Sequence, residues 1–298
     1  MSADGLEQYL QQWRAGKRNS PVTTTTTTRG GETVGAIPPK RRSFRPHRIV
    51  PQLYLGALKD VQDTWALHQR LLPEKMLLVV STCDRGDRPR LEMRQLLPAA
   101  TATRQQGSCR VRRLAVCSWE ELEAHVGDAS RKAAATVVSV AATAEWLQKA
   151  VESRSFAGND GRGEASDDGS SAHGGVVYLK LCLPWSDEPS CLVHVHFDVA
   201  IALMRAVVDG LGRAVVCHCV AGVSRSVTLV CAFLLRCWCD ARATGEMPRS
   251  SGDAVKAVVE FVREVRLCAC PNAGFMQQLT EYASGLLSAE TVGALCRW

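Results

Sequence analysis

The stretch Val215–Ser226, which reads Val-Val-Cys-His-Cys-Val-Ala-Gly-Val-Ser-Arg-Ser, decides the fold around it. Its β-branched start is typical of a buried strand, and the apolar run that follows, Val227–Leu235, is typical of a buried helix. A loop wrapped at a helix N-terminus points backbone N–H groups inward, and with the positive end of the helix dipole it can hold an anion. We therefore predict a strand, an anion-binding loop and a helix, in that order.

The same loop carries a cysteine and an arginine that suit phosphate chemistry. Cys219 ends the strand, where loop amides, the helix terminus and Arg225 favour thiolate over thiol; such surroundings lower a cysteine pKa from about 8.5 to roughly 3.5–7.5. Arg225 can present two N–H donors to a phosphoryl group. Gly222 permits positive φ and a close approach of the backbone to a ligand. Ser224 suits a helix N-cap, and Ser226 can place a hydroxyl near the sulfur.

The motif His218-Cys219-x5-Arg225-Ser226 resembles the phosphate loop of cysteine-dependent protein phosphatases, and Ala-Gly-Val-Ser-Arg-Ser is similar to their dual-specificity branch. The resemblance implies an α/β fold with a central mixed, mostly parallel sheet flanked by helices. It implies that Cys219 is the nucleophile and that Ser226 makes the sulfur a better leaving group. His218 is expected to orient the loop and tune the thiol, or to be a satisfied core histidine. The implied phosphate-binding residues are Val220, Ala221, Gly222, Val223, Ser224 and Arg225.

A general acid must lie on a loop that can close over the phosphate loop. Pro184-Trp185-Ser186-Asp187 is similar to the Trp-Pro-Asp loop of tyrosine phosphatases, with a serine in place of the proline. Asp187 is therefore the candidate acid, 32 residues before Cys219, and Glu188 is the neighbouring alternative.

A third match lies near the C-terminus. The stretch Pro271–Leu279 resembles the family's Pro-Asn-x-Gly-Phe-x-x-Gln-Leu signature. The resemblance implies that Asn272 helps to hold the phosphate loop, while Phe275 and Leu279 are expected in the core.

The remaining elements follow from hydrophobic patterns and from the resemblance of 49–57, with its Leu-Tyr-Leu-Gly turn, to the opening of dual-specificity domains. An amphipathic stripe at Phe197, Ile201, Met204 and Val208 predicts one helix. A stripe of valines predicts another, which we expect Ser251 or Asp253 to cap. The other predicted helices are 60–72 and 119–132, and the predicted strands are 49–57, 76–80, 114–116, 136–140 and 176–183.

About 95 residues separate Val80 from Val176, whereas in the family only a short segment separates the early strands from the strand that leads to the acid. Two alignments remain: either 76–80 is the family's second strand, or 136–140 takes that place and the insertion lies around 84–113. We favour the second alignment.

The predicted domains are a disordered basic leader at 1–45, a catalytic domain at 46–288 with an insertion within about 84–175, a flexible loop at 156–175, and an extension at 289–298.

Composition limits the other possibilities. The net charge of +6 belongs to the first 50 residues, which hold nine Lys or Arg and three acids, so the body is neutral. No apolar run of about 18 residues predicts a membrane span. Thirteen scattered cysteines do not form a disulfide framework, which favours a reducing compartment, cytoplasmic with nuclear as the alternative. The pairs Cys237/Cys239 and Cys268/Cys270 lack zinc spacing, so we expect core thiols and no metal.

The resemblance implies a protein phosphatase that hydrolyses phosphotyrosine and phosphoserine or phosphothreonine through a cysteinyl-phosphate, without a cofactor. Its expected partners are phosphorylated proteins, with a protein kinase docked through Lys40–Arg45 as a further possibility, and no nucleic acid. The alternatives are a phosphoprotein-binding scaffold (a pseudophosphatase) and a phosphoinositide or RNA 5′-phosphatase. The neutral Val220, Ala221 and Val223 argue against phosphoinositides, and Ser224 and Ser226 against RNA.

Overall fold

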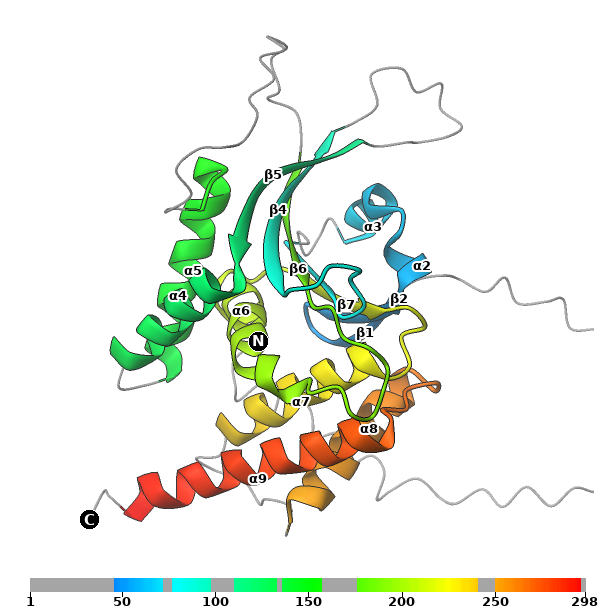
Figure 1. Ribbon diagram of the computed structural model, residues 1–298, viewed down its shortest axis with the longest axis vertical. Coiled ribbons are helices and arrows are strands. Elements are labelled where there is room, and N and C mark those ends of the chain that lie inside the picture. The colour runs from blue at the N-terminus through cyan, green and yellow to red at the C-terminus, as the bar shows by residue number, and fades with distance from the viewer. Residues whose placement is uncertain are drawn as a thin grey trace, which may run out of the picture.

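The computed structural model describes residues 46–71, 77–97, 110–132, 136–156, 176–240 and 250–295. Its centre is a seven-stranded sheet in the order β1-β2-β7-β3-β6-β4-β5 (Figure 1). Helices flank this sheet, so the predicted α/β class with a mixed sheet is confirmed. The strands are β1 His47–Val50, β2 Leu53–Ala57, β3 Leu78–Ser81, β4 Arg90–Leu97, β5 Arg110–Ser118, β6 Val176–Cys182 and β7 Val215–Cys219.

The four strands β2, β7, β3 and β6 run parallel to one another in the middle of the sheet. β1 pairs antiparallel with β2, and β4 and β5 add an antiparallel hairpin beyond β6. The carboxyl ends of the parallel strands therefore meet at one edge, which is where ligands bind in open α/β sheets. β5 forms one border of the sheet, and Arg110, Arg112 and Arg113 on it are exposed.

The two faces of the sheet are covered differently (Figure 1). Helices α2 and α3 lie on one face, over a small cluster that includes Leu67, Val79 and Val216. Helices α4 to α9 lie on the other face, over a large core in which α7 is buried along nearly its whole length. The helices are α2 Leu58–Val61, α3 Thr64–Arg70, α4 Trp119–Lys132, α5 Thr136–Ser153, α6 Phe197–Arg205, α7 Arg225–Asp240, α8 Ser251–Val265 and α9 Ala273–Leu295.

Most predicted elements are present. The strand–loop–helix unit appears as β7 and α7, and α4 has the predicted bounds. The predicted helix at 60–72 is divided, because the Asp63 side chain accepts a hydrogen bond from the Ala66 N–H and starts α3 anew. The stripe from Phe197 lies in α6 and the π-helical turn Ala206–Gly210. The helix α8 is present, but the predicted cap at Ser251 or Asp253 is wrong, because the side chain of Ser250 accepts the N–H of Asp253 and caps the helix.

The strand predicted at 136–140 is wrong, because these residues begin the helix α5. A short β-branched run does not distinguish a strand from a buried helix, and here alanines and other good helix formers continue it. The favoured alignment fails with it: β3, from the 76–80 stretch, lies between β7 and β6. In the chain, the hairpin β4–β5 and the helices α4 and α5 lie between β3 and β6. Where the insertion begins and ends remains a prediction.

Several predictions lie wholly or partly outside the described residues: the leader 1–45, most of the loop 156–175, and residues 296–298 of the extension. Cys237 and Cys239 are core thiols as expected, but Cys268 and Cys270 are exposed, so that expectation is wrong for the second pair. They lie in the turn after α8, where Ala269 between them is buried and the two cysteines on either side face solvent. Among the described helices, none has both the length and the apolar character to cross a membrane.

The packing of α5 on the common core is testable with Leu147, which is fully buried. We expect Leu147→Ala to lower the free energy of unfolding by about 2–5 kcal/mol, because it removes apolar contacts and leaves a cavity. Denaturant unfolding should still show one transition, because α5 shares the core with α6 and α7. The matched change Lys149→Ala, at an exposed position of the same helix, should have a much smaller effect. Equal effects of the two variants would show that α5 does not belong to the core.

Candidate active site

The site is a loop at the carboxyl edge of the sheet. β7 ends at Cys219, α7 begins at Arg225, and residues 220–224 connect them. Cys219 is only 1 % exposed, whereas Val220 is 55 % exposed, so the sulfur lies at the floor of the loop and the loop's rim faces solvent.

The carbonyl groups of this loop all point away from its centre, each toward a donor in a neighbouring element. Donors come from the start of α2, from the chain after α8, and from the first turn of α7. Because the carbonyls face outward, the N–H groups are left to face inward. The acceptor–donor pairs are Val220 O with Leu58 N (3.1 Å), Ala221 O with Arg266 Nη2 (3.0 Å), Gly222 O with Arg266 Nε (2.6 Å), Val223 O with Cys270 N (2.7 Å) and Ser224 O with Thr228 N (2.9 Å).

The sulfur of Cys219 receives the hydrogen bonds that this arrangement provides. The N–H of Gly222 donates to Sγ over 3.1 Å, and the hydroxyl of Ser226 donates over 3.3 Å. Burial alone would raise the pKa of Cys219. The Ser226 hydroxyl and the backbone N–H groups of Ser226, Val223 and Gly222 outweigh burial and lower the pKa below its ordinary value. The loop can therefore hold a thiolate and, next to it, the oxygens of a phosphoryl group.

Gly222 has to be glycine for two reasons. Its φ is +67°, in the left-handed region, and a Cβ built there would lie 2.5 Å from the carbonyl oxygen of Gly56. The guanidinium of Arg266 lies equally close, because it reaches under the loop to bind two of its carbonyls. Arg266 is 7 % exposed and also contacts His47 Nδ1 at 2.9 Å. Sequence reasoning missed Arg266, and its only signal was a basic residue shortly before the Pro-Asn signature.

Arg225 connects the loop to the segment that carries the candidate acid. Its Nη1 donates to the carbonyl oxygen of Trp185 over 3.1 Å, and its Nε lies 3.5 Å from Asp187 Oδ2. The Asp187 side chain is 43 % exposed, so its carboxyl group faces the mouth of the site. Glu188, the alternative acid, is also exposed, and its carbonyl accepts a backbone bond from Cys191 at 3.0 Å. The structure thus places the Asp187 carboxyl group beside the Arg225 guanidinium.

Asn272 lies between the phosphate loop, residues 219–225, and the segment 184–189 that carries Asp187, which we call the acid loop. Its backbone N–H donates to Ser224 Oγ over 3.3 Å, and its Nδ2 lies 3.4 Å from Oδ1 of Asp187. Its Oδ1 accepts the N–H of Phe275 and so caps α9. Gly274, in the same turn, lets the backbone of Pro189 pack directly against the start of α9, since a Cβ there would overlap the Pro189 carbonyl. Phe275 and Leu279 are fully buried.

His218 faces away from the loop, toward the side of the sheet that α2 and α3 cover. Burial lowers its pKa to about 4, so the ring is neutral at pH 7. Its Nδ1 is buried without a hydrogen-bond partner in the described part of the chain. Its backbone carbonyl, by contrast, accepts two bonds from Thr82, at 2.9 Å from the N–H and 3.1 Å from the hydroxyl. These contacts tie the end of β7 to the end of β3.

The role of Ser226 in ionising the thiol can be tested directly. We expect Ser226→Ala to raise the pKa of Cys219, because it removes a donor to the sulfur, so that the thiol is less ionised at any given pH near neutrality. The measurement is the pH dependence of iodoacetamide alkylation, followed at Cys219 by peptide mass spectrometry. Ser288→Ala, which removes an exposed hydroxyl on α9, is the control and should leave the profile unchanged. A profile in Ser226→Ala that matches the unmodified chain would contradict the assignment.

Comparisons with known proteins bear on this geometry. Residues 171–284 match the family model described as dual specificity phosphatase, catalytic domain. Human dual specificity protein phosphatase 22 is 38% identical over 112 residues, which cover 36% of this chain and 50% of that protein. Rat dual specificity protein phosphatase 5 is 31% identical over 105 residues, covering 35% of this chain and 24% of the relative. The chain thus spans about half, or less, of the curated relatives it matches.

Solved structures are more distant. A crystal structure of human DUSP28 is 19% identical, with a TM-score of 0.41, and covers 84% of this chain and 97% of that chain. The Yvh1 phosphatase domain from Chaetomium thermophilum is 16% identical, with a TM-score of 0.44, and covers 81% and 95%. The family match, by contrast, includes the acid loop, the phosphate loop and the Pro-Asn turn, whose residues meet at one edge of the sheet. Residues 171–284 of this chain are therefore similar to the dual specificity phosphatase catalytic domain.

Proposed function

We propose that this chain is a protein phosphatase that hydrolyses phosphotyrosine and phosphoserine or phosphothreonine through a cysteinyl-phosphate. One observation carries the proposal: the buried sulfur of Cys219 accepts hydrogen bonds from the Gly222 N–H and the Ser226 hydroxyl, at the centre of a loop whose carbonyls are all bound outward. Such a loop stabilises both the thiolate and the equatorial oxygens of a phosphoryl group in transfer.

In the first step, the Cys219 thiolate attacks phosphorus in line with the leaving oxygen. The S–P bond forms as the P–O bond breaks, and Asp187 gives its proton to the departing phenolate or alkoxide. Arg225 and the loop N–H groups bind the three equatorial oxygens, whose charge the transition state spreads. Arg225 Nε lies 3.5 Å from Asp187 Oδ2, so the proposed acid lies beside the group that would bind the equatorial oxygens.

In the second step, water attacks the cysteinyl-phosphate. Asp187, now a carboxylate, removes a proton from that water, the P–O bond to water forms and the S–P bond breaks. The Ser226 hydroxyl, already 3.3 Å from the sulfur, stabilises the departing thiolate. Arginine and amides bear the charge throughout, so the mechanism uses no metal or cofactor.

The proposed substrates are phosphorylated proteins, by resemblance to the dual-specificity family. Cys219, Arg225 and Asp187 are present together, which disfavours a pseudophosphatase. The neutral Val220, Ala221 and Val223 disfavour phosphoinositides. We further propose that the catalytic domain spans residues 46–288 and that the protein is cytoplasmic. The segment Lys40–Arg45, which lies outside the described residues, is proposed to dock a protein kinase.

The mechanism predicts two different variant phenotypes. Cys219→Ser should lower aryl phosphate hydrolysis at least about a thousandfold, because the nucleophile is lost. Asp187→Asn should lower kcat by about 10²–10⁴ for phenyl phosphate, whose leaving group needs a proton, and much less for p-nitrophenyl phosphate, whose leaving group is stable. Steady-state kinetics on both esters checks this. Retained turnover in Cys219→Ser, or equal losses on both esters in Asp187→Asn, would contradict these roles.

The position of the acid loop gives a second prediction. Gly274→Ala should displace the backbone at Pro189 and with it Asp187, so kcat for phenyl phosphate should fall about tenfold or more while the phosphate loop still binds vanadate. Gly285→Ala, on the same helix with open space around it, is the matched control and should keep full activity. If Gly274→Ala also keeps full activity, the contact with Pro189 does not position the acid.

A further inference from the structure

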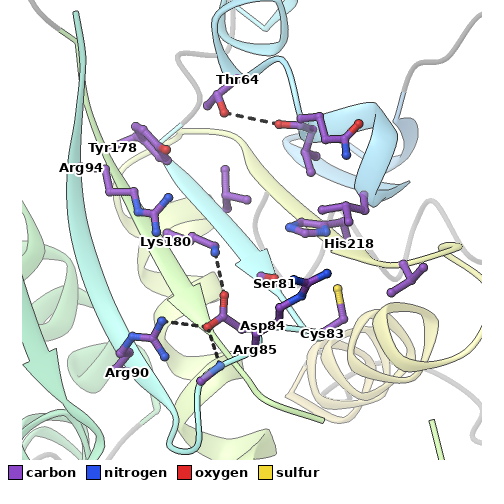
Figure 2. A pocket seen from close by; sticks show the side chains of 16 residues that line it. Thr64, Ser81, Cys83, Asp84, Arg85, Arg90, Arg94, Tyr178, Lys180 and His218 are labelled. Carbon is purple, nitrogen blue, oxygen red and sulfur yellow. Dashed lines mark hydrogen bonds and ion pairs between the residues drawn. The ribbon is translucent and has the colours of Figure 1, made fainter. Parts of the chain in front are cut away.

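A cavity of about 650 Å³ lies on the face of the sheet that α2 and α3 cover, beside the phosphate loop (Figure 2). Its floor is made by side chains of β3, β4, β6 and β7, and its wall by α2, α3 and the turn after β3. The residues used below are Leu58, Ser81, Asp84, Arg85, Arg90, Arg94, Tyr178, Lys180, His218 and Val220.

Strand register explains why this face is polar beyond β3. Arg94 pairs with Tyr178, and Glu92 pairs with Lys180, so these side chains share one face of the sheet. The alternate residues Leu91 and Met93 point to the opposite face and are fully buried in the main core. The hairpin strand β4 therefore contributes a row of charged groups to the cavity and a row of apolar groups to the core.

The charges in the cavity do not balance. Asp84 is its one lining carboxylate among the described residues, and it already binds Lys180 Nζ and Arg90 Nη2, each at 2.8 Å. Burial raises the pKa of Asp84, but Lys180 and then Arg90 hold it at about 2. Four basic side chains line the same cavity, namely Arg85, Arg90, Arg94 and Lys180.

The buried Glu92 offsets a second positive charge from beneath. It accepts from Arg90 Nε at 2.8 Å and from Arg94 Nε at 2.7 Å. A surplus of two positive charges remains. Arg85 is exposed and has no ion pair or hydrogen bond within the described residues. Its guanidinium is therefore available to an anion from outside the described chain.

The cavity and the phosphate loop lie at the same edge of the sheet. Arg85 follows the carboxyl end of β3, and Ser81 on that strand is the register partner of His218. Val220 and Leu58, which line the cavity, are joined by the hydrogen bond that fixes the rim of the phosphate loop. A chain segment that places one residue in the phosphate loop therefore has a neighbouring residue near the cavity.

We propose that this cavity is a second anion subsite, which binds the carboxylate or phosphate of a residue flanking the phosphoresidue of a protein substrate. The proposal rests on the proposed function, since it describes how that same substrate is chosen. Arg85 makes the direct ion pair, and Arg90, Arg94 and Lys180 supply the surrounding positive potential. An anion there relieves the charge surplus that the protein's own carboxylates leave.

The experiment compares phosphotyrosine peptides that carry glutamate or glutamine at each of the flanking positions in turn. For the full chain at low ionic strength, we expect glutamate at one or two of these positions to raise kcat/KM about fivefold over glutamine. Arg85→Ala should abolish that preference and leave p-nitrophenyl phosphate turnover unchanged. Arg88→Ala removes an equal charge from the same exposed turn outside the cavity and should keep the preference. No preference at any position, or equal loss in both variants, would overturn the proposal.

A binding measurement separates this proposal from the proposed function. On Cys219→Ser, fluorescence anisotropy should show tighter binding of a phosphotyrosine peptide with flanking phosphoserine than of the same peptide with flanking serine. The difference should shrink in the double variant Cys219→Ser/Arg85→Ala. A chain without turnover that still binds in this way would reject the mechanism and keep the subsite. A chain that turns over aryl phosphate but binds both peptides equally would reject the subsite and keep the mechanism.

Discussion

The site depends on the outward direction of five successive carbonyl groups, from Val220 to Ser224. A peptide chain turned so tightly can aim its N–H groups at one point only if the opposite ends of those peptides find donors elsewhere. The donors come from three separate parts of the chain, and Arg266 supplies two of them with one side chain. The unusual backbone at Gly222 follows from the same requirement, because the guanidinium and the Gly56 carbonyl occupy the space a side chain would need.

The residues between β3 and β6 are joined to this site rather than added at a distance. Trp119, the first residue of α4, packs edge-on against His196 with ring centroids 5.1 Å apart. His196 Nδ1 in turn accepts the indole N–H of Trp185 over 3.2 Å, and the Trp185 carbonyl binds Arg225. Burial lowers the pKa of His196, which favours the neutral ring that this acceptor role needs. A continuous set of contacts therefore links α4 to the base of the acid loop.

The sequence was sufficient for the strand–loop–helix unit, the acid loop and the Pro-Asn turn, because in each the local chemistry requires particular residues at fixed spacing. It was insufficient where tertiary packing decides. The run at 136–140 has the β-branched content of a strand but continues as α5. β4 alternates charged and apolar residues over Arg90–Arg94, which is typical of a strand, but only the fold shows that its charged row faces a cavity rather than solvent. Arg266 carries no motif, and its contacts with residues 221 and 222 exist only in the fold.

The hairpin beyond β6 also changes what the molecule presents at its border. β6 pairs with β4 on its outer side, and β5 becomes the outermost strand at that side of the sheet. Its exposed arginines, Arg110, Arg112 and Arg113, are concentrated in the first half of the strand. If two molecules met border to border with these strands parallel, like charges would face each other across the new ladder, which is unfavourable. Within the described residues, the border strand of the sheet thus carries positive charge that disfavours such pairing with a second copy.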